Sequence, residues 1–147
     1  MPAVFDKSGI AFAYPDNWVI EEDASNDPYP QVTVASPRTA FWSLCAYPHG
    51  TNREQLVEEA VEALRADYPE LDVESVTESI ELRLLDGVDV RFLYLDLIVR
   101  ARIQVFDDRG RTYFLLCQAE DDEFEAMSPV FLAMTTSLLR GDASIAP

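Results

Sequence analysis

Basic residues are scarce in this sequence. Its 147 residues include 11 Lys and Arg against 27 Asp and Glu, a formal net charge of −16, and Lys7 is the only lysine. Binding to nucleic acid and to anionic membranes depends on basic side chains that neutralise phosphates. The charge therefore argues against both partners. It leaves two interpretations: a surface adapted for solubility, and a surface that meets a basic protein partner.

Long apolar runs are also missing. No run approaches the roughly 20 apolar residues that a membrane-spanning helix needs. Residues 1–7 lack the basic segment and the following apolar stretch of a signal peptide. We therefore expect a cytoplasmic protein.

Cysteine and histidine are too few for most catalytic or metal sites. Cys45 and Cys117 are the only cysteines, and His49 is the only histidine. We expect reduced, buried thiols, with a Cys45–Cys117 bridge as the alternative if their strands are neighbours. A hydrolase built on Cys45 and His49 would need a third, orienting group, and the loop context does not supply one. One histidine and two distant cysteines also fall short of a closed zinc ligand set.

Acidic residues are abundant, but their local contexts explain them. Asp107 and Asp108 lie in a turn, and residues 121–123 open a helix, where acids complement the helix dipole. Asp96 interrupts an apolar run, and we interpret it as a bend residue that reaches solvent. The five glycines form no phosphate-binding loop. We therefore expect no catalytic residues, no cofactor and no metal.

The composition is that of a globular protein, with 48% hydrophobic and 26% charged residues. The length fits one domain, which we place at residues 1–141, with 142–147 as a C-terminal tail. Strand patterns cover residues 9–15, 31–35 and 40–47, and the polar, proline-interrupted residues 21–30 indicate a surface loop. We expect Trp18 to be buried where the chain turns back after Pro15.

A helix is predicted over residues 52–68. Thr51 and Glu54 have the spacing of a capping box, and Pro69 ends the pattern. The apolar positions Leu56, Val57, Ala60, Val61 and Leu64 recur at helical spacing. The opposite face then presents to solvent the acids Glu54, Glu58, Glu59 and Glu62, and we expect the same exposure for Glu21, Glu22, Asp23 and Asp27 in the first loop.

The second half has the pattern of an antiparallel meander. Residues 73–85 are strand-like, Asp86-Gly87 predicts a two-residue hairpin turn, and residues 88–106 form a long run with a break near Asp96. Residues 107–110 predict a second hairpin, with Gly110 at a left-handed bulge position. Residues 112–119 are apolar almost throughout, which is typical of a central strand covered on both faces.

The last element is a helix that ends at Gly141. Pro129 interrupts the apolar face of this helix. It either kinks one helix or begins a second one with Ser128 as its N-cap. Strands, one helix, a meander and a closing helix together predict the α+β class, with a twisted antiparallel β-sheet flanked by helices.

Two segments resemble the Mog1/PsbP-like superfamily. GIAFAYPDNW at residues 9–18 resembles its opening Gly-x-x-aromatic-x-Tyr-Pro-x-x-Trp, and residues 111–139 are similar to its last strand and helix, including the pair Ser137-Leu138. The resemblance implies an α/β/α sandwich. It also implies non-catalytic roles such as a Ran-binding factor, a photosystem II extrinsic subunit and secretion-associated chaperones. No partner-binding residue carries over.

The sequence therefore predicts a non-enzymatic protein-interaction or adaptor domain, as a monomer or weak homodimer. The alternatives are a chaperone-like domain that cradles apolar client segments and the Cys45/His49 hydrolase. An acidic face would favour the adaptor, an apolar groove the chaperone, and a pocket holding Cys45 and His49 the enzyme. The candidate partner-binding residues are Tyr29, Glu54, Glu58, Glu59 and Glu62.

Overall fold

The fold is a seven-stranded antiparallel sheet with a helix on each face. A computed structural model describes residues 2–23 and 29–141, and the predicted tail at 142–147 lies outside these ranges. A two-stranded sheet, β1 (Pro2–Lys7) and β2 (Ile10–Pro15), precedes the main sheet. The other elements are β3 (Val19–Asp23), β4 (Gln31–Ala35), β5 (Phe41–Pro48), α1 (Arg53–Asp67), β6 (Asp72–Ile80), β7 (Arg83–Tyr94), β8 (Leu97–Asp108), β9 (Arg111–Glu120) and α2 (Asp121–Arg140).

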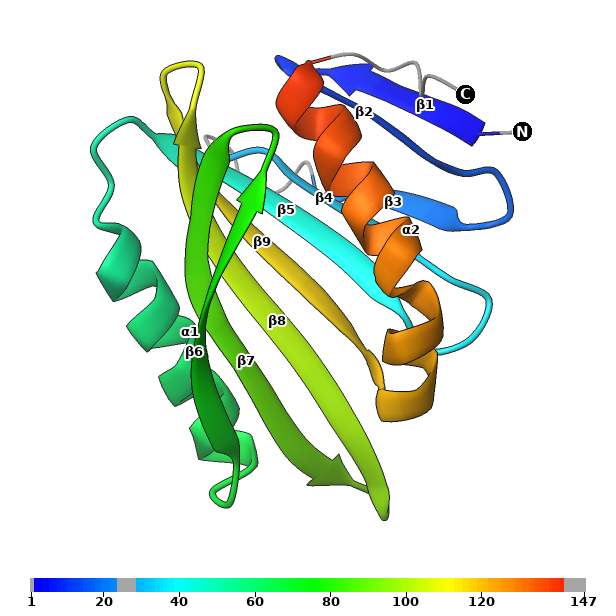
Figure 1. Ribbon diagram of the computed structural model, residues 1–147, viewed down its shortest axis with the longest axis vertical. Helices are drawn as coiled ribbons and strands as arrows, with labels where there is room; N and C mark the ends of the chain where they lie inside the picture. The colour runs from blue at the N-terminus through cyan, green and yellow to red at the C-terminus, as the bar shows by residue number, and fades with distance from the viewer. Residues whose placement is uncertain (1, 24–28, 142–147) are drawn as a thin grey trace.

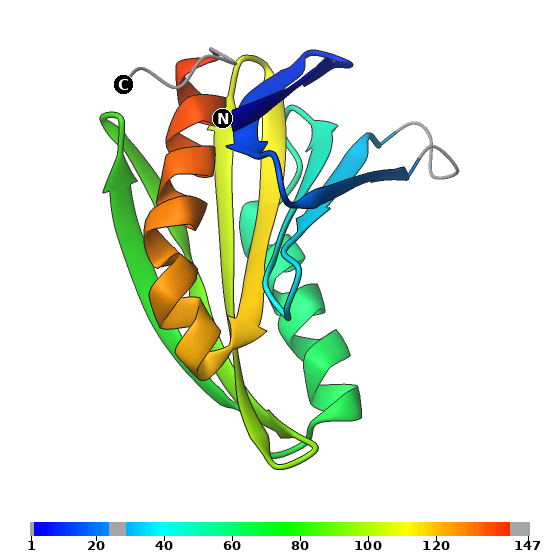
Figure 2. The same cartoon turned by 90° about the vertical axis from the view of Figure 1, so that its right-hand side faces the viewer.

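The main sheet has the strand order β3-β4-β5-β9-β8-β7-β6, so β9 is central. Tyr113, Leu115 and Cys117 belong to the core on the α2 side, and Phe114 and Leu116 pack on the α1 side. This alternation confirms that β9 is covered on both faces. Figures 1 and 2 show α1 on one face of the sheet, α2 on the other, and β1 and β2 beside the C-terminal half of α2.

The β1–β2 hairpin and β3 differ from the sequence interpretation. Residues 2–7 form a strand that the sequence analysis missed, and residues 21–23 belong to β3 rather than to a loop. The expectation for Trp18 is confirmed. Its backbone N–H donates to the Pro15 carbonyl at 3.1 Å, and its ring lies edge-on to Phe131.

The prediction of a turn at Asp86-Gly87 is wrong, because both residues lie inside β7 and pair with β6 and β8. The chain turns instead at Glu81-Leu82 and at Leu95-Asp96, where all four residues have positive φ. Gly87 is needed for space rather than for a turn. A Cβ there would lie 1.7 Å from the Ile103 carbonyl oxygen.

The structure contains turns at the two other predicted positions. The predicted break near Asp96 is confirmed as the β7–β8 turn. The second hairpin is confirmed as well, but Asp108 pairs directly with Arg111, so Arg109-Gly110 is a two-residue turn without a bulge. One continuous strand was predicted over residues 73–85, but β6 ends at Ile80.

Helix α2 runs without interruption through Pro129. Ser128 does not cap a second helix, since its hydroxyl donates to the Phe124 carbonyl one turn earlier at 2.8 Å. The N-cap is Glu120, and Gly141 closes the helix at a φ of 65°. No helix in the ranges 2–23 and 29–141 is long and apolar enough to cross a membrane.

Candidate interaction face on helix α1

Helix α1 begins one residue later than its sequence pattern suggests. The N-cap is Asn52, whose side-chain oxygen accepts from the Gln55 N–H at 3.1 Å. The predicted Thr51–Glu54 capping box is therefore wrong. The Thr51 hydroxyl donates instead to the Pro48 carbonyl at 2.7 Å and ties the helix to the end of β5.

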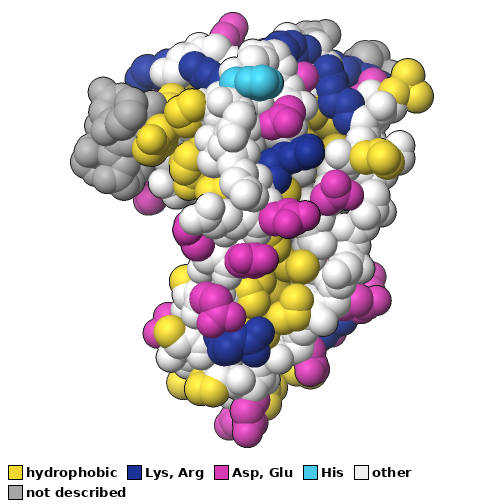
Figure 3. Space-filling view, turned by 90° about the vertical axis from the view of Figure 1, so that its left-hand side faces the viewer, with side chains coloured by type: hydrophobic (Ala, Val, Ile, Leu, Met, Phe, Trp, Pro, Cys, Tyr) yellow, Lys and Arg dark blue, Asp and Glu magenta, His cyan; other side chains and the backbone are white. Residues whose placement is uncertain are grey.

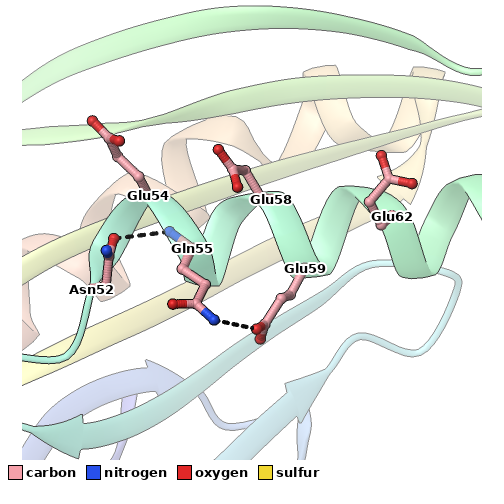
Figure 4. Close-up of a pocket in the computed structure, with 6 residues that line it drawn as sticks. All are labelled: Asn52, Glu54, Gln55, Glu58, Glu59 and Glu62. Carbon is pink, nitrogen blue, oxygen red and sulfur yellow. Dashed lines mark hydrogen bonds between the residues drawn. The ribbon is translucent and has the colours of Figure 1, made fainter.

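The outer face of α1 is acidic and exposed, as predicted. Figure 4 shows Glu54, Glu58 and Glu62 along one edge of the helix, with Gln55 and Glu59 along the other. Together with Asn52, these five residues border a hollow of about 460 Å³. Glu54 and Glu58 also border a second hollow of about 370 Å³ with Asp86 of β7. Carboxylates thus dominate the outer surface of α1, which Figure 3 shows from outside.

An aromatic pair lies beside the second edge. Tyr29, 40% exposed, packs against Tyr47 of β5 with ring centroids 5.3 Å apart. Burial, a hydrogen bond with Cys45 and the nearby charge of Glu59 raise the pKa of Tyr47 to about 12. The Gln55 amide donates to the Glu59 carboxylate at 2.9 Å and fixes its position. Tyr47, a residue that the candidate set omitted, therefore packs against Tyr29 and lies within the electrostatic influence of Glu59.

The remaining predicted acids are separate from this face. Glu21 and Glu22 are exposed on β3, the edge strand farthest from β6, and Glu22 accepts a hydrogen bond from Lys7 at 2.9 Å. Asp23 is the last residue of the same strand. Asp27 lies outside the described residues. The acids of α1 and those of the first loop therefore do not form one described patch.

The two cysteines lie on opposite faces of the sheet. Cys117 is the register partner of Trp42, whereas Cys45 is the partner of Phe114. Partners point to the same face and successive residues alternate, so the three-residue offset places the thiols on opposite sides. Both are free, and the bridge that the sequence left open is absent.

Cys45 and His49 do not form an activated pair. Burial raises the pKa of Cys45, although a hydrogen bond from Tyr47 opposes this shift. A raised pKa keeps the thiol protonated at neutral pH, and the thiolate is the nucleophile. His49 is exposed in the turn after β5.

Three acids of the second hairpin and of the first turn of α2 have protein partners. Asp107 accepts from the Thr112 hydroxyl at 2.6 Å, and Asp108 bonds Arg83 at 2.9 Å. Glu123 accepts from Thr39 and Ser36. Asp121 lies half-buried and Asp122 exposed in the first turn of α2, and Asp96 is exposed in its turn. In the described ranges, no group of three or more His, Cys, Asp or Glu side chains could hold a metal ion.

A buried ionic cluster on the α2 side was missed by the sequence analysis. Asp89, 6% exposed, accepts two bonds from Arg102 at 2.7 and 2.9 Å and one from Arg100 at 3.3 Å. The Arg100 guanidinium also lies 4.4 Å above the Phe124 ring. The available signal was the alternation of charged with apolar residues in both β7 and β8.

Comparisons with known proteins agree on the fold. No protein-family profile and no curated relative matches the sequence. The solution structure of cyanobacterial PsbP from Synechocystis is similar with a TM-score of 0.60 and 13% identity, over 93% of this chain and 89% of that one. A protein of unknown function from Pseudomonas aeruginosa, PA94, is similar with a TM-score of 0.53 and 11% identity, over 93% and 95%. The chain has the Mog1/PsbP-like fold that its opening and closing segments resemble.

Proposed function

We propose that this chain is a non-enzymatic, cytoplasmic protein-interaction domain that docks a basic partner on α1. The observation that carries the proposal is the joining of two features at one place. The exposed carboxylates of α1 include Glu59, whose charge acts on Tyr47, and Tyr47 packs against the partly exposed Tyr29. Aromatic side chains anchor interfaces, and surrounding charges select the partner and speed its approach.

The two features have different roles in this proposal. Exposed ion pairs contribute only about 0–1 kcal/mol each, so the acids contribute mainly to the association rate. Tyr29 gains most from binding, because its exposed ring would be buried. Its contact with Tyr47 already restricts the ring, which lowers the entropy lost on docking.

The chemistry of Cys45 supports a role without catalysis. Its raised pKa leaves a protonated thiol, and its hydrogen-bond partner is Tyr47 rather than His49. The hydrolase alternative would need the opposite shift.

The chaperone alternative finds less support in the groove beside α2. This groove has a volume of about 300 Å³, and its apolar wall of Phe124, Phe131 and Leu132 faces Glu78 and Arg102. A space of this size holds one or two side chains rather than an extended apolar segment. Charged groups along it also favour polar occupants.

The test begins with capture of the partner from native lysate and continues with kinetics on the purified pair. Glu58→Gln/Glu62→Gln should lower the association rate several-fold at low salt, because two steering charges are lost. The effect should shrink as salt rises, since screening lengths fall to about 8–10 Å at physiological ionic strength. Asp6→Asn/Glu74→Gln is the control, since it makes the same charge change at exposed positions elsewhere.

The aromatic anchor needs its own variant. Tyr29→Ala should raise the dissociation rate about tenfold, which corresponds to about 1.4 kcal/mol. An association rate indifferent to salt and to the α1 substitutions, together with an unchanged dissociation rate in Tyr29→Ala, would reduce the acidity to a solubility feature.

A further inference from the structure

The β7–β8 turn carries an exposed apolar tip that the proposed function does not use. Five of the six residues from 93 to 98 are apolar. Their exposed fractions are 65% for Leu93, 50% for Tyr94, 78% for Leu95, 50% for Leu97 and 48% for Ile98. Figures 1 and 2 show this turn at one end of the molecule, beyond the first turn of α2. We refer to residues 93–98 as the apolar tip.

The apolar tip is not explained by the needs of the turn. Leu95 and Asp96 have φ values of 49° and 65°, which is the backbone of a two-residue turn that favours Asn or Gly. A leucine in the left-handed region is strained, and an exposed leucine gains no burial.

The apolar tip is supported on one face through Tyr94. The Tyr68 ring, just after α1, stacks on Phe92 at 4.2 Å and meets Tyr94 edge-on at 6.2 Å. Phe92 is itself buried in the core beneath α1. An apolar surface that is already ordered loses little entropy on binding.

Charges around the apolar tip define its partner. Tyr68, which contacts Tyr94, is flanked in sequence by the exposed Asp67 and Glu70, and Asp72 is the register partner of Arg91. On the α2 side, Glu120 is the register partner of Val99, and Asp121 and Asp122 follow it. The bases in the same segments are Arg65, Arg91 and Arg100, of which Arg65 pairs with Glu62 and Arg100 with Asp89. The apolar tip therefore has a predominantly acidic border.

From this arrangement we infer that the apolar tip docks into an apolar cleft of a partner protein whose rim carries Lys or Arg. The apolar tip adjoins the C-terminal end of α1 and shares no residue with the set Glu54, Glu58, Glu59 and Glu62. A second copy of the chain would bring acids against acids, and an anionic lipid surface would be repelled for the same reason.

The test uses a synthetic amphipathic Leu/Lys helical peptide as a probe, and an otherwise identical Leu/Glu peptide. Binding is followed by titration with backbone NMR, which shows where the peptide sits. Wild type should bind the Leu/Lys peptide with the largest shift changes at residues 93–98, and should bind the Leu/Glu peptide at least tenfold more weakly.

Leu95→Asn is the decisive variant, because stability and binding should change in opposite directions. Asparagine tolerates the left-handed backbone, so the melting temperature should stay or rise, while affinity for the Leu/Lys peptide should fall at least tenfold. Leu82→Asn is the matched control. Leu82 is fully exposed in the β6–β7 turn with a φ of 64°, and its substitution should leave peptide binding unchanged.

Several outcomes would overturn the inference. Shift changes on α1 alone, or equal affinity for both peptides, would do so. Self-association of wild type that Leu95→Asn abolishes would assign the tip to a second copy. Binding to phosphatidylcholine vesicles that depends on Leu95 would assign it to a lipid surface. Glu58→Gln/Glu62→Gln in the same titration keeps the two surfaces distinguishable, since it should not affect the apolar tip.

Discussion

Replacing Asp89 with asparagine should destabilise the protein strongly, even though the two side chains have nearly the same shape. Asp89 is 6% exposed, and its two carboxylate oxygens receive three bonds from Arg100 and Arg102. The asparagine side chain would retain one acceptor oxygen and would turn an NH₂ group toward the guanidinium groups. The variant therefore removes the charge that compensates two half-buried arginines.

The magnitude follows from the contacts. Hydrogen bonds to charged groups contribute about 1.5–3 kcal/mol each, and breaking a buried ion pair on one side costs about 3–5 kcal/mol. Arg102 would retain its ion pair with Glu78 at 3.8 Å, which reduces the loss of stability. We expect the free energy of unfolding to fall by about 3 kcal/mol for Asp89→Asn, a drop in melting temperature of about 6–12 °C at this chain length.

The pH dependence supplies an independent check. Burial alone would raise the pKa of Asp89, but Arg102 and Arg100 outweigh it and hold the pKa below its usual value of 3.8. A lowered pKa means that the folded state favours the charged form. The stabilisation is therefore complete above the unfolded-state pKa and is lost as the pH falls through the folded-state pKa. The difference between wild type and Asp89→Asn should be constant from pH 7 to about 4 and should narrow below.

Urea unfolding followed by tryptophan fluorescence measures both effects, since Trp18 and Trp42 are buried in the core. Asp86→Asn is the matched control, an exposed carboxylate on the same strand, with an expected change of under about 0.5 kcal/mol. A loss of less than about 1 kcal/mol at pH 7, or a difference that does not narrow in acid, would refute this account of the cluster.

Three further predictions concern the backbone, the thiols and the start of α2. Gly87→Ala should cost at least about 3 kcal/mol in urea unfolding, because its Cβ would overlap the Ile103 carbonyl oxygen, whereas Gly110→Ala, with open space and only a φ of 78°, should cost about 1–2 kcal/mol. Cys117, which is buried, and Cys45, which is half-buried, should react slowly with a thiol reagent in the native protein and rapidly in urea, and equal fast rates would contradict their raised pKa values. Glu123→Gln should lower stability by about 1.5–3 kcal/mol in thermal unfolding, because its carboxylate accepts bonds from Thr39 and Ser36 at 2.5–2.8 Å, and an unchanged melting temperature would count against it.

The sequence by itself determined the elements whose pattern is local and regular. Helix α1 follows from apolar spacing and Pro69, and the acids on its outer face follow from helix geometry. The apolar run of β9 indicated a strand covered on both faces. The resemblance at residues 9–18 and 111–139 predicted the fold. The order of the elements can be seen in the sequence, and only a few topologies are compatible with a given order.

Where local signals compete, the packing of the whole sheet sets the outcome. Asp86-Gly87 has the chemistry of a turn, but Gly87 lies where β8 approaches too closely for a side chain, and no local pattern contains that distance. Glu81-Leu82 and Leu95-Asp96 make the real turns because strand registers impose them on unfavourable residues.

The residues of the candidate sites differ in the same way in how far local sequence predicts them. Exposure of Glu54, Glu58, Glu59 and Glu62 was predictable from the helix, whereas the contact of Tyr29 with Tyr47 required neighbouring strands to be placed. Asp89 has the local pattern of a solvent-facing residue in an alternating strand. It is buried because β8 lies beside it in a register that sets Arg102 opposite, and pairing between distant residues is set by the packing of the whole sheet rather than by local sequence.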